Sequence, residues 1–202
     1  MHRRGFLRQV SFTAGVLGFS ALPFALARLM APEVAAAPHR HIPLPGALTD
    51  AQAFREACIG CGLCGEVCPP RCVRFHSYNG GRAVNTPYIN PEEKSCTLCG
   101  LCMKVCPTAA LRETPIREVR MGIAQIDRAA CYPWVDKGVC GACVSVCPLG
   151  DDAIGFQFGN LYRPAVREGC VGCGQCVEVC PHPSLPIRIV KRPGGTVVRH
   201  PI

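Results

Sequence analysis

Aromatic side chains and charges are both scarce in this 202-residue sequence. Aromatic residues account for 6% of the chain, with a single Trp, and charged residues account for 18%. So few rings cannot build a large aromatic core. The 21 Gly and 19 Pro exclude a long coiled coil. The hydrophobic fraction of 49%, combined with the modest charge, argues against intrinsic disorder.

Recognisable catalytic patterns are absent as well. The sequence has no nucleophile elbow and no Gly-rich phosphate loop. Its six His are scattered, so we expect surface or structural roles for them. We therefore do not expect this chain to be an enzyme with a substrate site of its own.

Cysteine, by contrast, is abundant. The 17 Cys make up about 8% of the chain, close to the level that marks a protein dominated by a cofactor or by disulfides. Sixteen of them fall into four repeats, in which Val precedes the fourth Cys and Pro follows it. Three repeats have the spacing Cys-x2-Cys-x2-Cys-x3-Cys-Pro, and one has eight residues in its first gap. In chain order the sets are Cys58, Cys61, Cys64 and Cys68; Cys96, Cys99, Cys102 and Cys106; Cys131, Cys140, Cys143 and Cys147; and Cys170, Cys173, Cys176 and Cys180.

This spacing is the one that holds [4Fe–4S] clusters. Three Cys at x2 intervals wrap a tight loop round a cubane, where each reaches a different iron. Glycines inside such loops permit positive φ angles and let backbone N–H groups approach the sulfurs. They are Gly60, Gly62, Gly100, Gly141, Gly172 and Gly174. A zinc site would instead use two Cys-x2-Cys pairs with longer gaps between them, and a disulfide framework would not need a Cys-Pro repeat.

In two-cluster ferredoxins the fourth Cys of one motif ligates the other cluster. Four motifs therefore predict two ferredoxin-like 2[4Fe–4S] modules and four [4Fe–4S] clusters, with all sixteen motif Cys as iron ligands. We expect an α+β fold in which short helices begin after each Cys-Pro and β-hairpins surround the clusters. Such small modules bury little apolar surface, so the apoprotein is expected to be largely unfolded.

The expected strands lie between the motifs. Residues 153–158 and 161–166 predict a hairpin around Gly159-Asn160, and residues 121–126 predict a strand leading to Cys131. Residues 187–189 and 196–198 suggest a closing hairpin.

Two features depart from the plain repeat. The third motif needs a loop over residues 132–139, yet all four of its thiols are present, so we expect a complete [4Fe–4S] site, with a three-iron or lost cluster as the alternative. Cys72 lies outside the motifs. We interpret it as a small buried apolar side chain, and the alternative is ligand exchange with Cys68.

The first residues are typical of an export signal. Arg3 and Arg4 form a twin-arginine pair, and residues 9–27 carry no charge. This pattern predicts a twin-arginine signal over residues 1–36, either cleaved after Ala36 or retained as an anchor. Residues 37–48 are Pro-rich and predict an extended linker. Residues 49–202 form the polyferredoxin region, with motif segments at about 50–80, 88–117, 122–155 and 161–192.

The formal charge of +8 does not predict nucleic-acid binding. Four of the basic residues lie in the export signal. Clusters held by thiolates would add negative charge that the other basic residues balance.

With these features the chain resembles the periplasmic polyferredoxins of the NapG/MauM type. The resemblance rests on the twin-arginine start, on Pro45-Gly46-Ala47-Leu48 before the first motif, on residues 120–124 before the third, and on the long gap from Cys131 to Cys140. It implies a periplasmic electron-transfer protein beside a membrane quinol-oxidising ferredoxin-type protein. Electrons would pass to a periplasmic redox enzyme or cytochrome, of nitrate-reductase type or in methylamine oxidation, and the twin-arginine translocase would export the chain.

The resemblance also implies nested pairing, the first motif with the fourth and the second with the third. Cys58, Cys61 and Cys64 would then share a cluster with Cys180. Adjacent pairing, first with second and third with fourth, is the alternative, and the sixteen ligands are the same in both.

Three functional hypotheses follow. The chain is an electron carrier, a fixed iron–sulfur subunit of a larger oxidoreductase, or a structural or metal-storage module with zinc or disulfides.

Overall fold

The computed structural model describes residues 41–77 and 83–192. The predicted export signal over 1–36 and the second half of the predicted closing hairpin, 196–198, lie outside the described residues. All described residues belong to one unit of the chain. None of the helices in the described ranges is long and apolar enough to cross a membrane.

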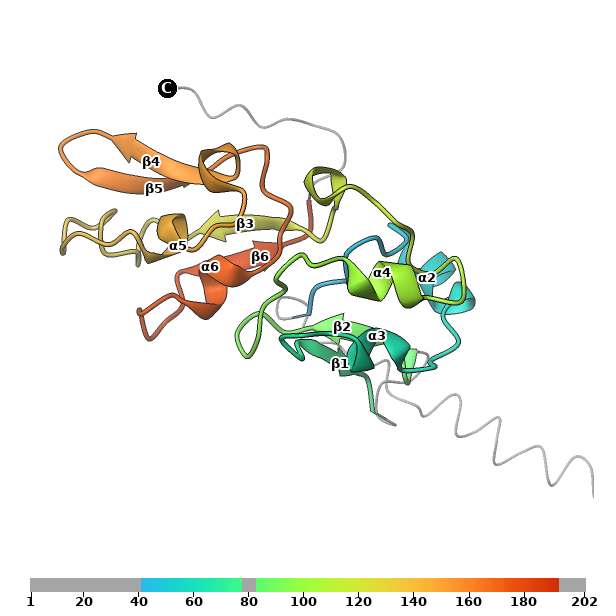
Figure 1. The fold of residues 1–202 in the computed structure, drawn as a ribbon. Helices are drawn as coiled ribbons and strands as arrows, with labels where there is room; N and C mark the ends of the chain where they lie inside the picture. The colour runs from blue at the N-terminus through green and yellow to red at the C-terminus, as the bar shows by residue number, and fades with distance from the viewer. Residues whose placement is uncertain (1–40, 78–82, 193–202) are drawn as a thin grey trace, which may run out of the picture. The chain divides into compact units, whose positions relative to one another are not determined.

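The described elements are short helices and two-stranded sheets, which confirms the predicted α+β class (Figure 1). The helices are α2 (Ala51–Ala57), α3 (Leu63–Glu66), α4 (Leu101–Val105), α5 (Ala142–Ser145) and α6 (Gln175–Glu178), with 3-10 turns η2 (Ile116–Glu118) and η3 (Gly150–Asp152). The strands are β1 (Val73–Phe75), β2 (Pro87–Ile89), β3 (Ile123–Ile126), β4 (Ile154–Phe158), β5 (Tyr162–Val166) and β6 (Ile187–Val190).

Antiparallel strand pairs occur in both halves of the chain. The predicted hairpin around Gly159-Asn160 is confirmed as β4 and β5, with Phe158 opposite Tyr162. Strand β3, which precedes the third motif, pairs with β6, which follows the fourth. In the first half, β1 pairs with β2, and an isolated bridge between Ala47 and Leu111 takes the place that β3 and β6 take in the second.

The prediction that a short helix follows each Cys-Pro is wrong. The helices instead precede the fourth Cys and carry the third. Helix α4 begins after Gly100, whose left-handed φ of 75° turns the chain out of the cluster loop. It ends at Val105, and the next residue, Cys106, has an extended ψ of 116° because a residue before proline disfavours the helical region. After the third Cys-Pro the chain does form the 3-10 turn η3.

The segment predicted to be a linker is, from His41 onward, part of the fold. Ile42 exchanges backbone hydrogen bonds with Ile89, at 2.9 and 3.0 Å. Leu44 is only 1% exposed and belongs to the buried core. The prolines prevent regular structure here, as expected, but the apolar residues between them are needed to fill the core of a small module.

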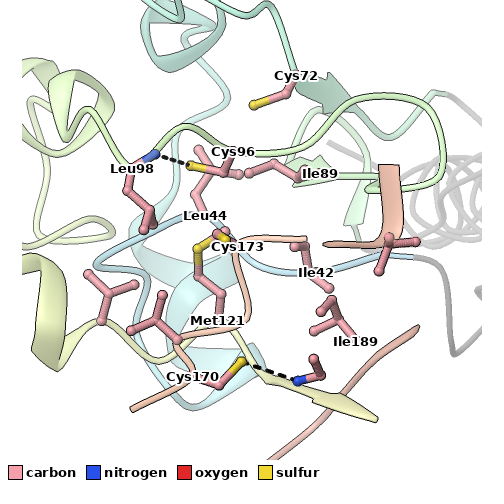
Figure 2. Close-up of a cluster of buried hydrophobic side chains, with 14 of the residues drawn as sticks. Ile42, Leu44, Cys72, Ile89, Cys96, Leu98, Met121, Cys170, Cys173 and Ile189 are labelled. Atoms are coloured by element: carbon pink, nitrogen blue, oxygen red, sulfur yellow. Dashed lines mark hydrogen bonds between the residues drawn. The ribbon is translucent and has the colours of Figure 1, made fainter. Parts of the chain in front are cut away.

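The core is one contiguous set of buried side chains that runs through both halves of the chain. Figure 2 shows Leu44 and Ile89 of the first half with Met121 and Ile189 of the second, around several Cys side chains. Thiols and aliphatic groups therefore share the same interior.

Replacing Leu44 with Ala tests whether the segment before the first motif stabilises the module. We expect the free energy of unfolding to fall by about 2–5 kcal/mol, because a fully buried leucine leaves a cavity. Anaerobic guanidinium unfolding, followed by loss of visible absorbance, measures the change. Pro43→Ala at the neighbouring exposed position is the control and should stay within about 1 kcal/mol of the parent. Equal stability of Leu44→Ala and Pro43→Ala would contradict the assignment.

Candidate metal centres

The first group of thiols combines the first motif with the last Cys of the second. Cys58, Cys61, Cys64 and Cys106 line one hollow of about 380 Å³. Helix α2 positions Cys58: the Asp50 carboxylate accepts from Ala53 N–H at its start, and the Cys58 N–H donates to Phe54 O at its end. We call this group site 1.

The second group mirrors the first. Cys96, Cys99 and Cys102 of the second motif line a hollow of about 300 Å³ together with Cys68 of the first. Cys72 lines the same hollow. We call the group of Cys68, Cys96, Cys99 and Cys102 site 2.

The second half of the chain repeats this exchange. Site 3 consists of Cys131, Cys140 and Cys143 with Cys180, which line a hollow of about 340 Å³. Site 4 consists of Cys170, Cys173 and Cys176 with Cys147. Cys147 is assigned to site 4 because Cys180, the fourth Cys of the fourth motif, lies at site 3. Burial, reinforced by neighbouring thiols, raises the pKa of Cys176 well above its ordinary value.

Adjacent pairing of the motifs is therefore correct, and nested pairing is wrong. Cys180 joins Cys131, Cys140 and Cys143 rather than the first motif. The reason is local: α3 packs on α4 and α5 on α6, while the hairpins β1–β2 and β4–β5 fold each pair of motifs together. Chain connections this short favour neighbours in sequence.

The donor chemistry at these sites fits a cubane. Each set offers four thiols within largely apolar walls, such as Phe54, Leu63 and Phe75 at site 1. In residues 41–77 and 83–192, no three His, Cys, Asp or Glu side chains lie close enough to hold a single metal ion. A cubane makes a different demand, because each thiolate binds a different iron at a different corner.

Burial raises the pKa of several of these thiols. Burial, reinforced by neighbouring thiols, raises the pKa of Cys64 to about 11 and that of Cys102 to about 12. The pKa of Cys143 and that of Cys173 rise to about 11, again chiefly through burial. Thiolates in these positions need a cation to offset the lost hydration, and iron binding supplies it while displacing the protons.

Backbone N–H groups contact several of the sulfurs, as the sequence predicts. Leu98 N–H donates to Cys96 Sγ at 3.3 Å, and Ala124 N–H donates to Cys170 Sγ at 3.4 Å. Leu98 holds a φ of 59° in the loop position that Gly60 fills in the first motif, so a residue other than glycine takes the positive φ there. Gly141 is also an exception, because its φ is −136°.

The long gap of the third motif, residues 132–139, forms a loop held by hydrogen bonds. Trp134 and Val135 N–H groups both donate to Cys131 O, at 2.9 and 3.1 Å. The Trp134 indole donates to Pro164 O at 3.0 Å, and the Arg128 guanidinium lies 4.1 Å from the indole ring centre. The extra residues thus leave Cys131 and Cys140 in one site.

The described His residues lie against tyrosine rings. His41 stacks on the Tyr88 ring with the centroids 3.9 Å apart, and the His76 ring is tilted against Tyr88 at 4.5 Å. His182 lies 4.5 Å from the Tyr132 ring. His2, His39 and His200 lie outside the described residues.

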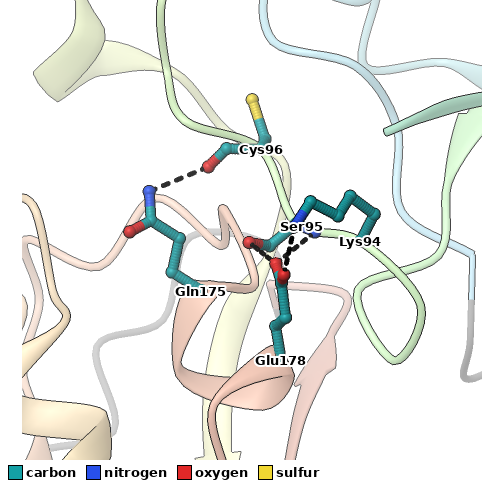
Figure 3. Close-up of polar contacts among 5 residues, drawn as sticks. All are labelled: Lys94, Ser95, Cys96, Gln175 and Glu178. Atoms are coloured by element: carbon teal, nitrogen blue, oxygen red, sulfur yellow. Dashed lines mark hydrogen bonds and ion pairs between the residues drawn. The ribbon is translucent and has the colours of Figure 1, made fainter. Parts of the chain in front are cut away.

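Sites 2 and 4 meet at a joint that the sequence did not predict (Figure 3). Cys96 N–H donates to Cys173 O at 3.1 Å, and the Gln175 amide donates to Cys96 O at 3.1 Å. The Glu178 carboxylate accepts from Lys94 Nζ at 2.7 Å and from the Ser95 backbone N–H at 2.8 Å. The Ser95 hydroxyl also donates to Glu178.

This joint is held by charge. Burial acts to raise the pKa of Glu178, but the hydrogen bonds from Lys94 and Ser95 outweigh it and hold the pKa below its ordinary value. A carboxyl whose pKa is lowered by folding stabilises the fold above its unfolded pKa and loses that contribution as the pH falls through the folded one. The joint is therefore expected to loosen only in acid.

Comparison with known proteins agrees with this arrangement. A 4Fe–4S dicluster domain matches residues 57–110, and another dicluster domain matches residues 123–181. The ferredoxin-type protein NapG of Haemophilus influenzae is 34% identical over 93% of this chain and 71% of its own length. NapG of Escherichia coli is 35% identical over 88% of this chain and 80% of its own.

A methylamine utilization ferredoxin-type protein, MauM of Methylobacillus flagellatus, is 34% identical over 75% of this chain and 68% of its own length. The chain belongs to the NapG/MauM family of ferredoxin-type proteins. The predicted resemblance, fold class and cofactors are thus confirmed: this NapG/MauM-type protein has two dicluster modules with four [4Fe–4S] clusters, and its chemistry is iron–sulfur electron transfer.

Paired Cys→Ala variants test the adjacent arrangement. Cys58→Ala combined with Cys106→Ala removes two thiols from site 1 alone, so about twelve of sixteen irons should remain. Cys58→Ala combined with Cys180→Ala damages sites 1 and 3, so about eight should remain. Iron analysis and electron paramagnetic resonance of the reduced proteins distinguish the two. The reverse order of iron contents would restore nested pairing.

Proposed function

We propose that the sixteen motif Cys ligate the four clusters as sites 1 to 4, and that electrons pass in the order site 1, site 2, site 4, site 3. The observation that carries this order is the backbone hydrogen bond between Cys96 of site 2 and Cys173 of site 4. It makes these two sites the inner neighbours of the two modules. Sites 1 and 2, and likewise 4 and 3, are neighbours through the exchange of the fourth Cys.

Exposure supports this order in the second module. Every Cys of site 3 is partly exposed, whereas Cys170, Cys173 and Cys176 of site 4 are buried. In the first module sites 1 and 2 each have one exposed Cys, Cys61 and Cys99, so their order rests on the contact between Cys96 and Cys173. In this proposal electrons exchange with partner proteins at sites 1 and 3 and cross the protein through sites 2 and 4.

The family membership and the twin-arginine start support a periplasmic role. We propose that the chain receives electrons from a membrane quinol-oxidising ferredoxin-type protein and delivers them to a periplasmic redox enzyme, of nitrate-reductase type, as the NapG relatives suggest. The similar identity to MauM favours one alternative, a role in methylamine utilisation. In either setting the chain acts as a relay, free or as a fixed subunit, with the substrate chemistry on another protein.

A Glu178→Ala variant tests the relay through the joint. Loss of the contacts to Lys94 and Ser95 should loosen the approach of sites 2 and 4, so electron exchange between the modules should slow several-fold while all four clusters remain. Pulsed one-electron reduction followed by time-resolved spectroscopy measures the redistribution.

Glu168→Ala is the matched control, because Glu168 is an exposed carboxylate of the same module. Its redistribution rate should equal that of the parent protein. An unchanged rate in Glu178→Ala, with the clusters intact, would contradict electron transfer through the joint.

Replacing Arg3 and Arg4 together with Lys tests the proposed location. The twin-arginine route requires the guanidinium pair, so the folded, iron-loaded protein should accumulate in the cytoplasm and disappear from osmotic-shock fluid. Arg28→Lys changes a basic residue outside the pair and should leave periplasmic recovery unaltered. Undiminished periplasmic recovery of the double variant would argue against this location and route.

A further inference from the structure

We infer that Cys72, the thiol outside the four motifs, donates an S–H···S hydrogen bond to the Cys68 ligand sulfur and raises the reduction potential of the cluster at site 2. This inference rests on the proposed assignment of Cys68 as a ligand of that site.

A tight turn returns Cys72 to the cluster. The Arg71 N–H donates to Cys68 O at 3.0 Å, and Arg71 holds a positive φ of 51°. The chain then enters strand β1 at Val73, with Cys72 directed inward and only 2% exposed. Its Sγ atom lies 3.5 Å from Cys68 Sγ. Cys72 lies near Cys96 in the shared core (Figure 2).

Cys72 is therefore part of the wall of site 2 itself. It lines the same hollow as the four candidate ligands, and the other walls near it are the aliphatic groups of Leu44, Val73 and Ile89. Thr97 and Gly100 also line the hollow, and the ligand sulfur Cys68 Sγ lies within hydrogen-bond distance of Cys72 Sγ. A buried polar group of this kind stays with the partner that satisfies it.

The direction of the bond follows from cluster chemistry. A ligand sulfur is a thiolate and carries no proton, so Cys68 accepts and Cys72 donates. Each iron of a cubane already holds three sulfides and one thiolate, which leaves no position for a fifth Cys beside Cys68. The second Cys of this close pair is thus a hydrogen-bond donor rather than a ligand.

A donor to a ligand sulfur favours the reduced cluster, because the reduced form carries more negative charge on its sulfurs. The hollow of site 1 is lined by four Cys among the described residues, with no counterpart of Cys72. Cys72 therefore stabilises an electron on site 2 relative to site 1, and so draws electrons inward from the exposed end of the relay. Cys72 is a positioning residue that acts through Cys68.

The test compares Cys72→Ala with Cys72→Ser in the full, cluster-loaded chain. Anaerobic redox titration followed by electron paramagnetic resonance should show one cluster shifted to lower potential in Cys72→Ala and the other three unchanged. Cys72→Ser keeps a hydroxyl donor and should restore most of the shift. Pro43→Ala changes an exposed side chain that lines none of the hollows of sites 1, 2 and 3, and it should leave the four potentials as in the parent.

Two results would overturn the inference. Four unchanged potentials in Cys72→Ala would show that no such bond acts on the cluster. Loss of about four irons in Cys72→Ala would show that Cys72 is itself a ligand. Failure of the proposed function is separate, because fewer than four clusters in the parent protein would refute the ligand assignment before any Cys72 variant is compared.

Discussion

Bonds between buried thiolates and iron are the interaction on which this small fold depends. The described helices are one or two turns long, and the sheets have two strands each. Such elements bury too little apolar surface to be stable alone. Many of the thiols lie within the core, and burial raises the pKa of several of them, such as Cys102. Iron binding would offset this cost, because it displaces the thiol protons and ties the four Cys of a site together.

The exchange of the fourth Cys holds the two motifs of each module together. A motif that kept all four thiols for its own cluster would fold round it independently. Here Cys68 and Cys106 cross to the neighbouring sites, and Cys147 and Cys180 do the same in the second module. Each crossing ties two helices and a hairpin together, and in the proposed relay it makes the two sites of a module direct neighbours.

The two modules are then joined by polar contacts rather than by further thiols. Glu178 binds Lys94 and Ser95 beside the backbone contact of Cys96 with Cys173. The segment Lys94, Ser95 and Cys96 therefore contains both a proposed cluster ligand and the contacts with the other module. In the proposed relay this segment therefore provides the contact through which sites 2 and 4 exchange electrons.

Local patterns in the sequence predicted what depends on local physics. The motif spacing located the sixteen thiols, and the Gly159-Asn160 turn between β-rich runs located β4 and β5. The short helices were predicted on the wrong side of each Cys-Pro. Proline restricts the residue that precedes it, so the helix of the second motif ends just before Cys106. Motif spacing does not predict contacts between residues far apart in the chain. Examples are the pairing of the motifs, the packing of Leu44 in the core and the hydrogen bonds between Glu178 and Ser95. The sequence suggested a link between Cys72 and Cys68, but the turn that brings them together depends on a positive φ at Arg71, which is not expected of a non-glycine residue.

The most direct measurement is iron and acid-labile sulfide per chain, together with the compactness of the protein before and after iron is removed. The account predicts about sixteen irons and as many sulfides in a brown, compact protein that expands and loses its folded spectrum once the iron is removed. A colourless chain that contains no iron and is nevertheless compact and cooperatively folded would contradict it.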